Sequence, residues 1–454
     1  MSQSVDAAGF QHDLIGVDQV DPHYERTTHP QAQWFPAAGL GMFLHWGLSS
    51  VDGNMDLSWG MMANTPWDGG HYNFNKMRPV DYWRLAERFD PAAYDPAVWM
   101  RAAAAAGVRY VVLTARHHEG FALWPSEFGH LNTRAHMGGR DLLQEYVAAC
   151  RACGLKVGFY YSPPDWYWCR SYMSFNYGNG VWPQEWADRF PEAYSLVPKA
   201  AWDERWEPRQ PPGPMPAEFE QEFARYIRGQ VCELLTRYGQ LDIIWFDGNP
   251  FRTIMPVTVD EIRALQPGIL INPRLHGVVD FETPECHLPE ARPAGWWEGC
   301  FIWNHGGWGY SRDEIYHSTG WFLDTFARHR TWSGNLLINC APRPDGRMPA
   351  TYYRRMAAVE AWVALHGETL FGTRGGPFPE ACDMPVTLSP QGDWFIHLTT
   401  RKGCTVTGRG APRRAVVHGT GKPIGWRCVG DKTLFMLRYE DITELDDVIV
   451  VEWD

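Results

Sequence analysis

Short apolar runs alternate with longer stretches of helical periodicity along most of the chain. The apolar runs are rich in β-branched and aromatic residues, and runs of this length are typical of buried strands. Seven of them are GLGMFLHW (39–46), VRYVVLTARHH (108–118), LKVGFYYS (155–162), LDIIWFDG (241–248), ILIN (269–272), CFIWN (300–304) and GNLLIN (334–339). Helical patterns lie between or after them at 79–89, 97–107, 140–154, 217–239, 258–268, 314–330 and 351–367. Strands that alternate with helices predict a parallel sheet covered by helices.

Two architectures share this alternation, the closed (β/α)8 barrel and the open doubly wound sheet. The barrel needs one strand more than the seven found, so either the eighth strand lies in a loop or the barrel is irregular. An open nucleotide-binding sheet carries a Gly-rich phosphate loop after its first strand, and no such loop follows His45. We therefore expect an α/β fold built on a (β/α)8-like barrel of the TIM type.

The pattern changes near residue 368. Short alternating runs follow at 393–400, 414–419, 433–439 and 447–453, and they are typical of a small antiparallel β-domain. We expect a barrel domain at 1–367 and a C-terminal β-domain at 368–454. Within the first, the Trp- and Pro-rich stretch 163–216 is too long for a simple connection, and its tryptophans argue against disorder. It is predicted to be a binding loop that arches over one rim of the barrel.

Composition narrows the class of protein. Of 454 residues, 45% are hydrophobic and 21% are charged, which is typical of a soluble globular chain. No run approaches the ~18 apolar residues of a membrane span, and the N-terminus lacks the pattern of a secretory signal. We expect a cytoplasmic protein unless a signal has been removed. The net charge of −12, without a basic stripe, disfavours a nucleic-acid partner.

Tryptophan is unusually abundant. The chain has 24 tryptophans, many beside glycine, proline or acidic residues rather than inside periodic runs. Aromatic faces stack on the C–H faces of sugars, so tryptophans in loops point to carbohydrate, although core packing accounts for about half of them. The ten cysteines form no dense framework, and the lone pair Cys150 and Cys153 is interpreted as ordinary thiols.

Polar residues follow nearly every predicted strand. In a parallel barrel the carboxyl ends of the strands form the active face. The residues at these ends are His45, Arg116-His117-His118-Glu119, Tyr160-Tyr161-Ser162, Asp247, Asn272-Pro273-Arg274, Asn304-His305 and Asn339. Asp247 precedes a glycine and taken alone is as well explained by a turn. The coincidence across seven strands favours a polar pocket with Asp247 at its floor.

The histidines raise the question of a metal. His117 and His118 are adjacent, so on a strand they would point to opposite faces and could not both bind one ion without a bend. A mixed site with His45 and Asp247 has no HExxH or similar spacing to support it. Hydrogen bonds to sugar hydroxyls explain the same residues, and we expect no metal and no organic cofactor.

Carboxylates suggest a reaction. A retaining glycosidase needs two carboxyl groups about 5 Å apart, one a nucleophile and the other an acid/base. Asp247 supplies one. The loop GVVDFETPECHLPE supplies four candidates for the other, and spacing does not choose among Asp280, Glu282, Glu285 and Glu290.

Taken in order, these motifs resemble one family. Over about residues 30–375, the sequence resembles the α-L-fucosidases of glycoside hydrolase family twenty-nine. The motifs that carry the resemblance, in chain order, are GMFLHWGLSSV, YVVLTARHHEGFALWPS, GFYYS, LDIIWFDG, the INPR–DFETPE segment, GNLLINCAPRPDG and HGETLFGT. The strand with paired histidines is the most specific match. The resemblance implies an irregular barrel, a C-terminal β-sandwich and an exo-acting enzyme that releases α-L-fucose with retained configuration.

The resemblance also implies roles for individual residues. Asp247 would be the nucleophile and Glu285 the acid/base. The fucose hydroxyls would be held by His45, His117, His118 and Tyr160, with Tyr161 a weaker candidate. Arg274 would lie beside the nucleophile, and Trp59 would pack on the sugar. The implied partner is a fucosylated oligosaccharide or glycoside.

Some positions depart from the family pattern. Ser58-Trp59 stands where many relatives have Glu-Trp, INPR replaces Asn-Asp-Arg, and HHE replaces His-His-Asp. These changes leave the reaction class in place and leave the glycoside open. The alternatives are an α-L-galactosidase with the same mechanism, a non-catalytic sugar-binding relative and a metal-dependent hydrolase.

Overall fold

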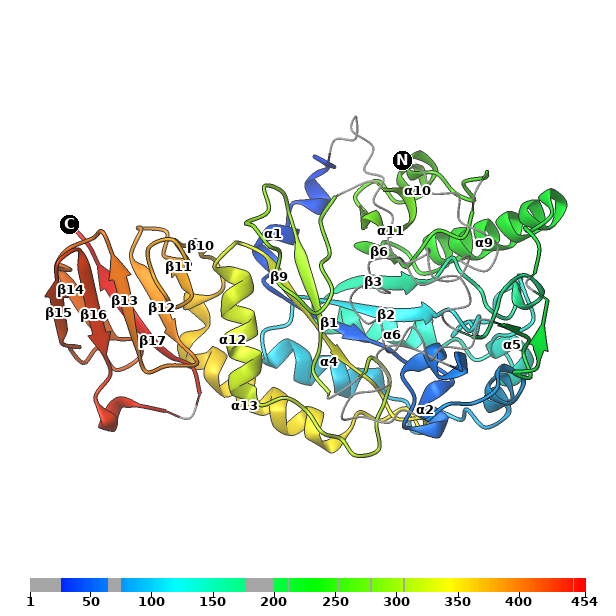
Figure 1. Cartoon of the computed structure of the whole chain (residues 1–454), viewed down its shortest axis with the longest axis horizontal. Helices are drawn as coiled ribbons and strands as arrows, with labels where there is room; N and C mark the ends of the chain where they lie inside the picture. Colours follow the sequence, from blue (N-terminus) through cyan, green and yellow to red (C-terminus); the bar gives the residue numbers. More distant parts are fainter. Residues whose placement is uncertain are drawn as a thin grey trace.

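A computed structural model describes residues 26–63, 75–176, 200–210, 212–251, 253–277, 280–304, 307–443 and 445–454. A larger part built around parallel strands is joined to a smaller part built of antiparallel strands, which holds the C-terminus (Figure 1). Within these ranges no helix has the length and apolar character needed to cross a membrane. His305 lies outside the described residues, and so do residues 177–199 and 211 of the predicted loop 163–216.

All seven predicted barrel strands are confirmed. They are β1 (Leu40–Leu44), β2 (Tyr110–Arg116), β3 (Lys156–Tyr161), β6 (Ile243–Phe246), β7 (Leu270–Ile271), β8 (Glu298–Ile302) and β9 (Asn335–Cys340). They form one curled parallel sheet in the order β7-β6-β3-β2-β1-β9-β8. Because helices cover the outside and apolar side chains fill the inside, nearly every strand residue is buried, which explains the continuous apolar runs.

The eighth position of the barrel is filled by a loop. The sheet does not close between β7 and β8. Residues 280–286 run through this gap, where Glu282 and Glu285 make isolated parallel bridges with Trp297 and Cys300. The missing strand therefore does lie in a loop, reduced to two bridges, and the barrel is irregular.

Eleven α-helices are described, and they include six of the seven predicted ones; the segment predicted at 79–89 is a single α-turn (Pro79–Tyr82) followed by a 3-10 helix (Trp83–Glu87). Their bounds are α1 (Phe35–Ala38), α2 (Ser49–Asp52), α3 (Pro79–Tyr82), α4 (Pro96–Ala105), α5 (Thr133–His136), α6 (Leu142–Ala152), α9 (Ala217–Arg237), α10 (Val259–Leu265), α11 (Pro273–His276), α12 (Thr319–Arg330) and α13 (Ala350–His366). Short 3-10 helices are η1 (Pro30–Ala32), η2 (Leu57–Met61), η4 (Trp83–Glu87), η5 (Arg170–Tyr172), η6 (Gly367–Thr369) and η7 (Tyr439–Asp441).

Capping side chains set several helix boundaries. Asp95 and Asp141 accept backbone N–H groups at the starts of α4 and α6, which satisfies donors that the helix itself leaves free. The helix predicted at 314–330 begins only at Thr319. Ser318 caps it, and Tyr316 just before it bridges back to Asn304, which keeps the preceding segment extended.

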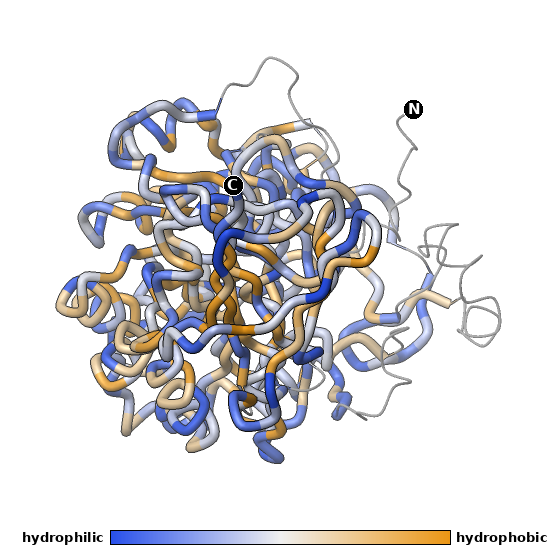
Figure 2. The backbone as a smooth tube through the Cα atoms, turned by 90° about the vertical axis from the view of Figure 1, so that its left-hand side faces the viewer, coloured by the Kyte–Doolittle hydropathy of each residue, from blue (hydrophilic) through white to orange (hydrophobic). Residues whose placement is uncertain are grey.

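The barrel interior is an aromatic cluster separate from the helix-facing core. It contains Phe35, Phe43, Tyr110, Tyr160, Trp245 and Phe281 with smaller apolar residues. Because this cluster fills the barrel, the polar groups at the strand ends stand on a rigid aromatic floor. Figure 2 looks at the molecule from the end that carries the C-terminal sheets, with hydrophobic segments in the middle of the view.

The C-terminal strands form two antiparallel sheets. One has the order β10 (Arg374–Gly375), β11 (Val386–Leu388), β12 (Trp394–Leu398), β17 (Asp447–Glu452) and β14 (Arg414–Val417), and the other β13 (Gly403–Thr407), β16 (Lys432–Met436) and β15 (Trp426–Val429). One apolar cluster with members from both sheets fills the space between them, as in a β-sandwich. The four predicted strands are confirmed as β12, β14, β16 and β17. Of the other four, β10 and β11 are short and β15 is exposed, whereas β13 alternates between buried and half-buried residues and was missed.

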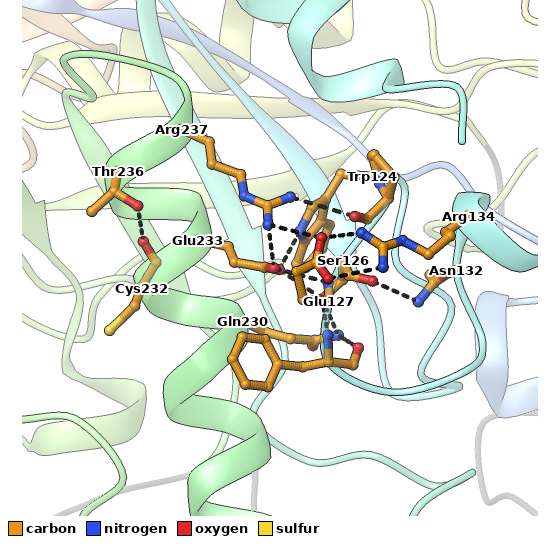
Figure 3. A network of polar contacts seen from close by, with 12 residues as sticks. Trp124, Ser126, Glu127, Asn132, Arg134, Gln230, Cys232, Glu233, Thr236 and Arg237 are labelled. Carbon is orange, nitrogen blue, oxygen red and sulfur yellow. Dashed lines mark hydrogen bonds and ion pairs between the residues drawn. The ribbon is translucent and has the colours of Figure 1, made fainter. Parts of the chain in front are cut away.

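A buried carboxylate anchors the loop that follows β2. Glu233, on α9, accepts hydrogen bonds from the Trp124 indole (2.8 Å), the Ser126 hydroxyl (2.6 Å) and the Glu127 backbone N–H (2.8 Å). Arg237, one turn along α9, completes the network with a 2.6 Å ion pair to Glu233 (Figure 3). The loop begins at the paired histidines, so this network fixes the segment that leaves the candidate site.

Candidate active site

Asp247 lies where β6 ends, in contact with three other strand-end residues. Its Oδ1 pairs with the guanidinium of Arg274 at 2.9 Å, and its Oδ2 accepts a 2.6 Å hydrogen bond from the Tyr160 hydroxyl. His118 Nε2 is 3.7 Å from the same Oδ2. The Asp247 backbone N–H still bonds to the neighbouring strand, and the left-handed turn falls on Gly248 (φ 95°). Glycine therefore makes the turn, and the aspartate side chain serves the pocket.

Arg274 joins the two candidate catalytic carboxylates. It lies on α11, directly after β7, and its second terminal nitrogen is 2.8 Å from Glu285 Oε2. Among the described residues, Glu285 is the one member of the four acidic candidates that pairs with Arg274. Asp280, by contrast, is buried and paired with Arg263 at 2.9 Å. The side chain of Glu285 is 39% exposed and that of Asp247 is 10% exposed, so the pair has an inner and an outer member.

The paired histidines lie on the same side, not on opposite faces as predicted. The prediction assumed that the strand continues through both, but β2 ends at Arg116 and the chain turns there. The two rings come to 4.1 Å between centroids. One nitrogen of each and one Asp247 oxygen lie within 4.8 Å of one another, a donor set that transition metals accept. The Arg274 cation on the same carboxylate opposes a second cation there.

His45 and His118 are neutral hydrogen-bonding groups. Burial, and then the neighbouring His117, lowers the pKa of His45 to about 3, and burial holds the pKa of His118 well below its ordinary value. His118 Nδ1 is 2.6 Å from Ser162 Oγ, and this hydroxyl donates onward to the Pro164 carbonyl. Nδ1 of His118 therefore carries the proton, and Nε2 remains an acceptor.

His117, just after β2, is held by two residues that also lie outside this strand. Its Nδ1 contacts the hydroxyl of Ser58, and Glu119 Oε2 is 3.5 Å from the same atom. Ser58 thus orients a histidine of the site. Glu119 is buried and brings a carboxylate to this ring from the loop after β2.

Aromatic rings complete the walls and floor. Tyr160 stacks between His117 (5.5 Å) and Trp245 (5.5 Å). Trp59 packs edge-on to His118 at 5.8 Å and to Trp166 at 5.1 Å. Trp166 comes from the predicted binding loop, so the described start of that loop does reach the site.

Tyr161 does not join this group. Its hydroxyl donates to Gln230 on α9, and its ring lies under the buried guanidinium of Arg116 at 4.4 Å. Successive strand residues point to opposite faces, so Tyr160 faces the barrel interior and Tyr161 the helices. The other predicted site residues, including Arg274 and Trp59, lie together with Asp247.

Three contributors to the site were given no role from the sequence, although Glu119 was named among the strand-end residues and Ser58 among the departures from the family pattern. Trp245 precedes Asp247 by two residues and faces the same interior, a signal that the period of two carries. Ser58 and Glu119 lie on a 3-10 helix and a loop, where no period marks the inward positions.

Comparisons with known proteins agree with this geometry. A family model described as alpha-L-fucosidase matches residues 18–368. The tissue alpha-L-fucosidase of Mus musculus is 25% identical over 377 residues, which cover 76% of this chain and 73% of that protein. The alpha-L-fucosidase of Branchiostoma floridae is 26% identical over 367 residues, with coverage of 76% and 73%.

Solved structures share the whole architecture. Alpha-L-fucosidase isoenzyme 1 from Paenibacillus thiaminolyticus superposes with a TM-score of 0.71 at 26% identity, covering 94% of this chain and 99% of that chain. An alpha-L-fucosidase GH29 from Bacteroides thetaiotaomicron superposes with a TM-score of 0.72 over 96% and 97% of the two chains, and at 20% identity it supports the fold alone. With the matched residues covering most of its length, the chain belongs to the alpha-L-fucosidase family.

Proposed function

We propose that the protein is an exo-acting, retaining α-L-fucosidase that hydrolyses terminal α-L-fucosyl residues of glycans or glycosides. The observation that carries this function is the contact of one guanidinium, that of Arg274, with both Asp247 and Glu285. It gathers two carboxyl groups into one small site, as a double-displacement mechanism requires. Family membership supplies the sugar.

The first step forms a covalent intermediate. An oxygen of Asp247 attacks the anomeric carbon, and the bond from that carbon to the leaving oxygen breaks as Glu285 gives that oxygen a proton. Arg274 and the Tyr160 hydroxyl hold the attacking carboxylate in place before the reaction, so little reorganisation accompanies bond formation.

The second step releases the sugar. Glu285, now ionised, takes a proton from a water molecule, whose oxygen attacks the anomeric carbon as the ester bond to Asp247 breaks. Two inversions return the original configuration, and both carboxyl groups end as they began. The greater exposure of Glu285 suits its exchange of protons with the leaving group and with water.

The sugar hydroxyls find neutral partners of known polarity. Nε2 of His118 lacks a proton, and so does Nε2 of His45, whose Nδ1 donates to the side-chain oxygen of Asn339 at 2.7 Å. Both Nε2 atoms accept hydrogen bonds, which suits hydroxyl groups. Trp59 offers an apolar surface beside His118. An α-L-galactoside differs from the fucoside only by a hydroxyl at carbon 6, and no described polar group gives a reason to prefer it.

Release of 4-nitrophenol from its α-L-fucoside and α-L-galactoside tests the proposal. The wild type should cleave the fucoside, and Asp247→Ala should lose several orders of magnitude in kcat. Azide should then restore turnover of Asp247→Ala with inverted product, and of Glu285→Ala with retained product. Glu290→Ala, an acid of the same loop without contact to Arg274, is the matched control and should stay active.

Two results would contradict the proposal. Full activity of Asp247→Ala would make Asp247 a structural residue. Cleavage of the galactoside in preference to the fucoside would keep the mechanism and change the substrate.

A further inference from the structure

A buried carboxylate lies at the opposite end of the barrel interior from the catalytic pair. Glu298 is the first residue of β8 and is fully buried. Among the described residues no lysine, arginine or histidine forms an ion pair with it. Its two oxygens instead accept hydrogen bonds from the Tyr110 hydroxyl (2.6 Å) and the Trp245 indole N–H (2.9 Å). Burying a carboxyl group without a cation costs free energy, so a role of Glu298 must account for its presence here.

Trp245 connects this carboxylate to the site. Its indole is buried and stacks with Tyr160, whose ring is 5.5 Å away and inclined by 18°. The guanidinium of Arg274 lies over the same indole, 4.6 Å from the ring centroid. The N–H is the one polar group of the indole, so its bond to Glu298 sets the rotation of the ring about its side-chain torsions.

Arg274 links the orientation of the Trp245 indole to the two catalytic carboxylates. A planar guanidinium over an aromatic face lies where the ring places it. The two terminal nitrogens of Arg274 hold Asp247 Oδ1 at 2.9 Å and Glu285 Oε2 at 2.8 Å. A tilt of the indole would therefore alter the relative placement of both carboxylates.

We propose that Glu298 is a positioning residue for the catalytic pair: by anchoring the Trp245 indole it sets the plane of the Arg274 guanidinium and so the placement of Asp247 relative to Glu285. The inference rests on the proposed function of those two carboxylates. Glu298 itself touches no reacting atom, and its influence passes through Trp245.

A variant of Tyr110 distinguishes a positioning role of Glu298 from a purely structural role. Tyr110→Phe removes the other hydrogen bond to the same carboxylate and leaves the Trp245 anchor in place. Both Tyr110→Phe and Glu298→Leu lower stability, but the anchor model assigns a catalytic loss to Glu298→Leu alone. Glu298→Gln keeps a carbonyl oxygen for the indole N–H and should preserve the catalytic rate.

The experiment is steady-state hydrolysis of 4-nitrophenyl α-L-fucoside by the full-length wild type, Glu298→Leu, Glu298→Gln and Tyr110→Phe. A misplacement of catalytic groups by a fraction of an ångström to 1 Å is expected to lower kcat of Glu298→Leu on the order of 10- to 100-fold. KM should change less than kcat, because the sugar-binding histidines do not contact Trp245 and Tyr160, which does, is also held by its hydrogen bond to Asp247. Glu298→Gln and Tyr110→Phe should keep kcat near the wild-type value.

A second variant covers the case in which Glu298→Leu folds poorly. Trp245→Phe keeps a ring under Arg274 and removes the indole N–H that bonds to Glu298, so it should lower kcat with Glu298 still in place. Equal kcat losses in Tyr110→Phe and Glu298→Leu, or wild-type kcat in Trp245→Phe, would overturn the proposal. An inactive wild type would instead refute the proposed function, so the two failures are distinguishable.

Discussion

Asn339, on β9, directs its side-chain oxygen at Nδ1 of His45, just beyond the neighbouring strand β1, at 2.7 Å. Its amide nitrogen donates to the Trp308 carbonyl at 2.8 Å, so contacts on both sides fix the orientation of the amide. Nδ1 of His45 therefore carries the ring proton. With its pKa lowered to about 3 by burial and by His117, the ring stays neutral and its Nε2 remains an acceptor.

Asn339→Asp should make activity sensitive to acid. A carboxylate beside Nδ1 favours the imidazolium form, so the pKa of His45 rises and the ring begins to protonate at higher pH. Protonation removes the Nε2 acceptor. We expect kcat/KM to fall as the pH drops below about 6, where the wild-type His45 is still neutral. The measurement is kcat/KM as a function of pH, with Asn339→Leu as the control without charge. If kcat/KM of Asn339→Asp falls at the same low pH as that of the wild type, His45 does not act as a neutral acceptor.

Ser58→Ala should weaken binding of the sugar without abolishing turnover. The hydroxyl of Ser58 contacts Nδ1 of His117. Without it, Glu119 is the remaining side chain that orients the His117 ring. A hydrogen bond of this kind contributes about 1 kcal/mol, so KM should rise several-fold. Ser50→Ala, which removes a buried hydroxyl bonded to the Gly47 carbonyl, is the control and should keep the wild-type KM. Equal KM values in both variants would remove Ser58 from the site.

Glu298 should make the folded protein less stable as the pH rises. Burial raises its pKa to about 7, above the unfolded value of about 4.3. Between these two values the folded state holds more protons than the unfolded state, so the free energy of unfolding decreases with increasing pH.

Glu298→Gln has no such proton to lose. Relative to the wild type, its free energy of unfolding should improve on the order of 2 kcal/mol between about pH 5 and 8. Denaturant titration at both pH values measures this difference, and Glu290→Gln in the exposed loop is the control. A difference that is independent of pH would mean that Glu298 keeps an ordinary pKa.

Glu233→Ala should lower stability far more than activity. It strands the donors of Trp124, Ser126 and Glu127 in a buried place, which costs roughly 2–4 kcal/mol. Thermal or denaturant unfolding measures the loss, with the exposed Glu222→Ala on the same helix as the control. If the two variants unfold alike, the network of Figure 3 contributes nothing to holding the loop.

The pattern of apolar runs predicts the seven strands because each is buried on both faces. It also places His45, Tyr160 and Asp247 at strand ends, where the topology brings them together. The pairing of His117 with His118 was mispredicted because a period-two argument holds only inside a strand, and β2 stops one residue earlier.

The choice of Glu285 lay beyond the pattern. Its position depends on the bridge to Cys300 of β8 and on the reach of Arg274, which are contacts between separate elements that no period in the sequence specifies. The sequence did not single out Glu298 because its partners are far from it along the chain. These partners are Tyr110 on β2 and Trp245 on β6. The proposed domain boundary at 367/368 and the cytoplasmic location stay predictions.

The gap between β7 and β8 has a consequence for how such an enzyme diversifies. Asp247 follows a strand that pairs with β3 along its whole length and with β7 over its first two residues, so a change in that strand disturbs the sheet. Glu285 rides on a segment with two bridges, and insertions on either side of it break no ladder. The outer half of the site, which holds Glu285, can therefore vary while the strand that places Asp247 stays as it is.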